Sequence, residues 1–87
     1  MKKYKVTEEF MRVRHEGLFI NCDLKDKTVL DLGCCIGYTG AWVLDKGAKH
    51  YTGVEYSTPL SETATLNLGK YFDNSVWQIK NESIESF

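Results

Sequence analysis

The chain alternates between stretches with strand-like and helix-like spacing of apolar residues. Short runs rich in β-branched and aromatic residues predict three strands, at about 28–32, 50–55 and 76–80. Apolar positions recur at roughly helical spacing before and between these runs, which predicts helices over about 7–16, 38–46 and 58–72. The last residues, 81–87, are expected to form a loop.

Local signals refine these boundaries. The run at 28–32, TVLDL, is nearly continuous in apolar character, which predicts a strand buried on both faces of a parallel sheet. Gly47 is a natural terminator for the second helix, whereas Gly40 inside that helix lowers its propensity. The third helix has a good start, because the hydroxyl of Ser57 can cap it and Pro59 fits its first turn.

The order of the elements predicts an α/β fold. Strands that alternate with helices favour a parallel sheet with right-handed crossovers, here of about three strands. With 87 residues the chain is expected to form one domain. Within it we expect an N-terminal helical segment over 1–27 and a βαβαβ unit over 28–87. The helical segment opens with a basic tail over 1–6, and Thr7 is the predicted helix cap.

Composition narrows the function classes. The chain is 43% hydrophobic and 26% charged with a net charge of −1, which argues against disorder and gives no indication of nucleic-acid binding. No apolar run approaches the roughly 20 residues of a membrane span. The N-terminal lysines are not followed by an apolar region, so no secretory signal is expected. Three cysteines without a CxxC pair predict neither a disulfide framework nor a zinc site. His15 and His50 lack metal-ligand spacing. Because the cysteines form no disulfide framework, a reducing, cytoplasmic location is expected.

Residues capable of chemistry follow each predicted strand. In parallel sheets ligands bind outside the carboxyl ends of the strands, so the segments 31–37, 55–57 and 81–83 are expected to converge on one crevice. Gly33 and Gly37 allow a sharp turn and a close approach of the backbone to a ligand. The amino terminus of the next helix suits a carboxylate or phosphate group. These features together predict a nucleotide-type cofactor site.

The second strand ends in an acidic residue. Glu55 can accept hydrogen bonds from ribose hydroxyls, and the ring of Tyr56 can cover an adenine face. The dinucleotide fingerprint G-x-G-x-x-G does not fit, because Cys35 and Tyr38 occupy its second and third glycine positions when it starts at Gly33. The spacing therefore argues against NAD.

Another pattern fits better. The series Asp31-x-Gly33-x-Cys35-x-Gly37 resembles motif I of class I S-adenosylmethionine-dependent methyltransferases, an acidic residue followed by alternate glycines. The segment GVEYS at 53–57 resembles the acidic second motif of that family. The resemblance is clear over residues 28–57 and weaker over 76–87. It implies a Rossmann-like, incomplete methyltransferase fold.

The resemblance also implies a cofactor, S-adenosyl-L-methionine, and roles for individual residues. Asp31 and the 33–37 backbone would hold its methionine portion, Glu55 its ribose and Tyr56 its adenine, whose edge would lie beside Glu82 and Ser83. The implied cofactor-binding residues are Asp31, Gly33, Cys35, Gly37, Glu55, Tyr56, Glu82 and Ser83. No catalytic residue is identified.

Cys35 departs from the family pattern, which has glycine there. If this position requires a positive φ, its Cβ costs on the order of 1 kcal/mol. The side chain also lies where it can crowd the ligand, so the sequence leaves the effect of Cys35 on cofactor affinity open. Neither Cys34 nor Cys35 has a base placed near it by the sequence, so small turn residues are expected rather than nucleophiles.

The chain has no evident acceptor pocket, and three hypotheses follow. The first is the N-terminal, cofactor-binding portion of a methyltransferase, truncated before the acceptor half and expected to be inactive alone, with the methyl acceptor unknown. The second is a non-catalytic S-adenosylmethionine-binding or partner module completed by oligomerisation or another chain, through the apolar edge of the first strand. The third is another Rossmann-like enzyme that binds NAD or a nucleotide sugar.

Overall fold

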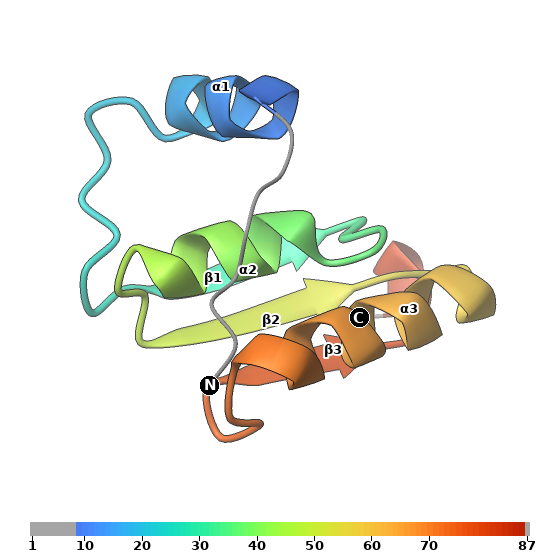
Figure 1. The fold of residues 1–87 in the computed structure, drawn as a ribbon. Helices are drawn as coiled ribbons and strands as arrows, with labels where there is room; N and C mark the ends of the chain where they lie inside the picture. Colours follow the sequence, from blue (N-terminus) through green and yellow to red (C-terminus); the bar gives the residue numbers. More distant parts are fainter. Residues whose placement is uncertain (1–8, 87) are drawn as a thin grey trace.

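The computed structural model describes residues 9–86 and shows three strands that alternate with helices (Figure 1). The elements are α1 (Glu9–Leu18), β1 (Thr28–Leu32), α2 (Tyr38–Asp45), β2 (His50–Val54), α3 (Thr58–Tyr71), β3 (Trp77–Lys80) and a 3-10 turn (Ile84–Ser86). The predicted basic tail, the cap at Thr7 and the last residue of the predicted loop lie outside the described residues. The predicted α/β fold is confirmed.

The three strands form one parallel sheet in the order β1-β2-β3. In this register Asp31 lies beside Gly53, and Gly53 lies beside Ile79. Helices α2 and α3 contact each other and cover the same face of the sheet (Figure 1). The architecture is therefore two layers, with the core between the sheet and this helix pair.

The core combines aliphatic and aromatic side chains. Tyr51 and Val54 of the central strand are fully buried, as are Val43 of α2 and Leu68 of α3. Each such side chain contributes roughly 1.5–3 kcal/mol when it leaves water. The helix ends agree with their predicted signals: the Ser57 hydroxyl accepts a bond from the amide of Leu60 at 3.3 Å, and Gly47 ends α2 with φ +95°.

The prediction for β1 was wrong in one respect, because this strand is not buried on both faces. Leu30 and Leu32 are 52% and 49% exposed. Val29 and Asp31 point to the opposite face, which α2 and α3 cover, and both are partly buried. Both helices lie on one side of the sheet, so nothing among residues 9–86 buries the other side of this edge strand.

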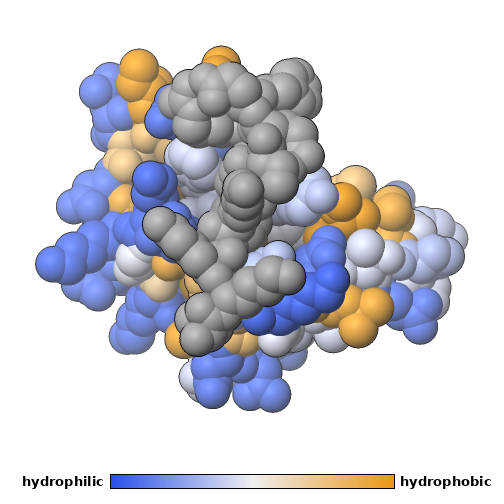
Figure 2. All heavy atoms as spheres, viewed as in Figure 1, coloured by the Kyte–Doolittle hydropathy of each residue, from blue (hydrophilic) through white to orange (hydrophobic). Residues whose placement is uncertain are grey.

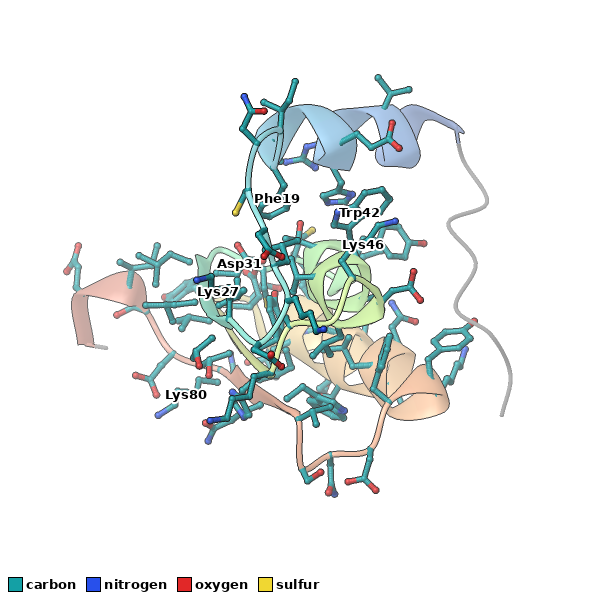
Figure 3. The ribbon with its side chains drawn as sticks, turned by 90° about the vertical axis from the view of Figure 1, so that its left-hand side faces the viewer. Phe19, Lys27, Asp31, Trp42, Lys46 and Lys80 are labelled. Carbon is teal, nitrogen blue, oxygen red and sulfur yellow. The ribbon has the colours of Figure 1, made fainter. Side chains whose placement is uncertain are left out.

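Helix α1 is attached to α2 mainly through one histidine. His15 is fully buried, its ring stacks on Trp42 with centroids 5.4 Å apart, and its Nε2 lies 2.9 Å from the Thr39 hydroxyl. Phe19 and Trp42 lie between the two helices (Figure 3). Helix α1 ends at Leu18, about two residues later than predicted, so it includes Gly17, and packing against α2 offsets that residue's low propensity.

The outer surface is mixed. Hydrophilic side chains alternate with separate small hydrophobic patches on the face shown in Figure 2. Within residues 9–86, every helix is too short or too polar to span a bilayer.

Candidate functional site

The loops that follow the three strands converge, as the sequence predicted, and two side chains join them. The carboxylate of Glu55 accepts a bond from the amide of Cys35 at 2.7 Å and one from the amide of Ser57 at 3.0 Å. The side-chain amide of Asn81 donates to the carbonyls of Glu55 and Tyr56 at 3.0 and 3.1 Å. The strand ends therefore form one continuous rim.

The loop between β1 and α2 is shaped by positive backbone angles. Gly33, Cys35 and Gly37 have φ values of +83°, +56° and +91°. An added Cβ at Gly33 would meet no atom within 4 Å, which leaves room beside the backbone, whereas at Gly37 it would lie 3.3 Å from the Ala64 Cβ. Cys35 is thus a non-glycine residue in the left-handed region, and the strain that the sequence predicted conditionally is present.

Asp31, the acidic residue of this loop motif, accepts a hydrogen bond from a buried residue of the core. Its Oδ2 accepts a bond from the Tyr51 phenol at 2.6 Å. Burial, the bond to Asp31 and the charge of Asp31 all raise the pKa of Tyr51, so the phenol remains a donor. The neighbouring Cys34 thiol is buried, and burial followed by the charges of Asp31 and Glu55 raises its pKa to about 11.

A small cavity of about 110 Å³ opens beside this loop. Its lining includes Asp31, Gly33, Cys35 and Tyr38, together with Arg14 from α1. An acidic and a basic residue thus line the same space. Such a pair matches the two charged groups of an amino-acid zwitterion, the ammonium and the carboxylate.

A larger cavity of about 660 Å³ lies at the ends of β2 and β3. Its lining includes Tyr56, which is 78% exposed, and both Glu82 and Ser83. Ser57 lines this cavity and Cys35 lines the smaller one, and Glu55 bonds to the amides of both. Glu55 therefore lies between the two cavities.

Six of the eight residues assigned by resemblance line one of the two cavities, Asp31, Gly33 and Cys35 the smaller and Tyr56, Glu82 and Ser83 the larger. Glu55 joins the loops between them, whereas Gly37 is buried against Ala64 and lines neither cavity. The roles of three further residues were not assigned from the sequence. These are Arg14, Tyr51 and Asn81. Asn81 carried a usable signal, since it is the first polar residue after the third strand. Arg14 and Tyr51 carried none, because they reach the site through long-range packing.

Residues 9–86 contain no group of three metal-ligating side chains. A thiolate is the nucleophilic form of cysteine, and the raised pKa of Cys34 keeps that thiol neutral.

Comparisons with known proteins agree with this geometry. No protein-family profile matches the chain. Over 58 residues, 67% of the chain, it is 38% identical to protein arginine N-methyltransferase 1 of Chlamydomonas reinhardtii. A Pyrococcus horikoshii protein described as an RNA methyltransferase superposes with a TM-score of 0.76 at 21% identity, over 97% of this chain. The Trypanosoma brucei PRMT1 enzyme-prozyme complex with AdoHcy also superposes with a TM-score of 0.76, at 24% identity over 88% of this chain.

The matches cover much less of the known proteins than of this chain. The chain spans 17% of the Chlamydomonas protein, 41% of the Pyrococcus protein and 24% of the Trypanosoma chain. The chain has the Rossmann-like fold of the cofactor-binding part of class I S-adenosylmethionine-dependent methyltransferases, as its glycine and acidic motifs predicted.

Proposed function

We propose that this chain binds S-adenosylmethionine and supplies the cofactor-binding part of a methyltransferase. The observation that carries the proposal is the position of Glu55 between two cavities of different character. S-adenosylmethionine has three parts in the same order: a zwitterionic amino acid, a ribose and an adenine.

The residues along the rim fit these parts. Asp31 and Arg14 would take the ammonium and carboxylate of the methionine portion in the small cavity. Tyr56, Glu82 and Ser83 border the larger cavity, where an adenine can stack and form hydrogen bonds.

Glu55 already accepts two backbone bonds, but a carboxylate offers about four acceptor positions. It therefore retains capacity for the ribose hydroxyls. The bound cofactor would supply an electrophilic methyl group, and the chain's own residues would bind and orient it.

The same features argue against NAD. NAD carries a pyrophosphate and no amino acid, so Asp31 would repel its charge at the loop where the methionine portion is expected. Cys35 also places a side chain at the point where the dinucleotide motif has glycine.

Calorimetry on the purified chain tests the proposal. S-adenosylhomocysteine is expected to bind with a measurable Kd, and NAD is expected to bind much more weakly or not at all. Tighter binding of NAD, or no binding of S-adenosylhomocysteine to folded protein, would contradict it.

The acceptor is a separate proposal. The Chlamydomonas relative is an arginine methyltransferase, so an arginine-containing peptide is the first acceptor to test with labelled S-adenosylmethionine. The cytoplasmic location stays a prediction.

The second hypothesis, a binding module completed by another chain, is supported by the half-exposed Leu30 and Leu32 on edge strand β1. Sedimentation analysis would detect self-association. A monomer that binds S-adenosylhomocysteine would argue against completion by a second copy.

A further inference from the structure

Tyr51 is a buried residue that bonds directly to the candidate site. It lies in the central strand β2 with its side chain fully buried, and its phenol donates to Asp31 Oδ2 at 2.6 Å. Asp31 is on the neighbouring strand β1 and lines the small cavity. The phenol therefore reaches the cavity wall from inside the core.

The surrounding backbone leaves space for this ring. A Cβ at Gly40 of α2 would lie 2.4 Å from Tyr51 Cε2, and a Cβ at Gly53 would lie 2.9 Å from the phenol oxygen. Real Cβ atoms do not approach so closely, so glycine on the helix and glycine on the strand permit this ring position. The Cys34 sulfur lies beside the same space, because a Cβ built on Gly53 would also be 2.8 Å from it.

The bond uses only one of the two carboxylate oxygens of Asp31. An ionised carboxylate accepts at both oxygens, so Asp31 keeps acceptor capacity for a ligand in the cavity. A charge-assisted bond from a buried donor also fixes the orientation of the carboxylate.

We propose that Tyr51 is a positioning residue, which orients the Asp31 carboxylate so that the site selects ligands with a cationic amino group. This inference rests on the proposed function, because it concerns the methionine end of the same cofactor site. If Tyr51 only supported the core, its substitution would change the affinity of every ligand of the site by the same factor.

Two ligands separate these roles. S-adenosylhomocysteine carries the amino-acid end, and 5′-methylthioadenosine lacks it but retains the ribose and the adenine. Tyr51→Phe keeps the ring and removes only the hydroxyl. Tyr71→Phe, at the end of α3, is the matched control.

We expect Tyr51→Phe to weaken the binding of S-adenosylhomocysteine about tenfold, which corresponds to about 1.4 kcal/mol. The Kd of 5′-methylthioadenosine should stay unchanged. Tyr71→Phe should change neither Kd. Equal loss of both ligands, or no loss of either, would overturn the proposal.

A second variant keeps the test decisive if Tyr51→Phe does not fold. Asp31→Asn removes the charge but retains an acceptor for the phenol, and the same ligand-selective loss is expected. An unchanged Kd for S-adenosylhomocysteine in Asp31→Asn would overturn the role assigned to the Tyr51–Asp31 pair. If the unmodified chain binds neither ligand, the proposed function itself fails and the inference fails with it; if it binds and only the variants disagree, the proposed function stands.

Discussion

The Glu55 carboxylate and the Cys35 amide, 20 residues apart in sequence, are joined by a hydrogen bond of 2.7 Å. The other carboxylate oxygen accepts from Ser57. One side chain thus fixes the loop after β1 to the loop after β2, in addition to the ribose-binding role proposed for it.

Replacing Glu55 by glutamine tests this link. A carboxamide has one acceptor oxygen, so its NH₂ group would face one of the two backbone amides and leave it without a partner. We expect the free energy of unfolding to fall by about 1–3 kcal/mol, measured by denaturant titration, together with weaker binding of S-adenosylhomocysteine. Glu62→Gln, on the exposed face of α3, is the control and should change neither quantity. Unchanged stability in Glu55→Gln would show that the two bonds contribute little.

Cys35→Gly should stabilise the fold. A non-glycine residue in the left-handed region costs roughly 1–2 kcal/mol, and the greater freedom of glycine in the unfolded chain offsets about 0.5–1 kcal/mol. The expected net gain is up to about 1.5 kcal/mol in the free energy of unfolding. Cys22→Gly makes the same replacement at an exposed cysteine without positive φ, and it should be neutral or destabilising. Destabilisation by Cys35→Gly would mean that its side chain contributes packing that outweighs the strain.

Gly40→Ala is expected to destabilise the protein although it improves helix propensity by about 1 kcal/mol. The new Cβ would lie 2.4 Å from the Tyr51 ring, and overpacking of this kind costs about 1–3 kcal/mol. Gly69→Ala is the matched control in α3, where the nearest atom would be 3.8 Å away, so the propensity gain should appear there undiminished. The comparison is a pair of thermal unfolding curves. A higher Tm in both variants would show that the Tyr51 ring can move aside at little cost.

Stability should fall in alkaline solution because of Cys34. Its pKa is about 11 in the folded protein, against the ordinary value of 9.0, so the unfolded chain loses this proton first. The contribution is therefore fully present below pH 9 and is lost as pH rises from 9 to about 11. Tyr51, whose pKa is also raised, adds to this loss above pH 10. Denaturant titrations between pH 7 and 11 should show a shallower decline in Cys34→Ala, and an identical decline would refute the assignment to Cys34.

Much of the fold could be predicted because its signals are local. The cap at Ser57 and the stop at Gly47 lie within a few residues of the helix ends that they define. The convergence of the three strand ends follows from parallel topology alone. The exposure of Leu30 could not be predicted in this way, because apolar composition does not specify which face of a sheet the helices cover.

The features of the candidate site likewise differ in whether local signals predict them. Its backbone features follow from glycine spacing, whereas the bond from Tyr51 to Asp31 and the approach of Arg14 depend on tertiary packing. Gly40 shows how a local rule misleads: its low helix propensity is a local cost, but in the folded protein it makes room for the Tyr51 ring.

Asn81 completes the rim, because its side chain bonds to the carbonyls of Glu55 and Tyr56 and accepts from the Thr58 hydroxyl at 2.9 Å. The loops after all three strands are thereby tied in series before any ligand arrives. The conformational entropy of ordering them is lost during folding, not during association. Binding should therefore proceed with small changes in amide hydrogen exchange along the rim, as a ligand enters a crevice that already has its final shape.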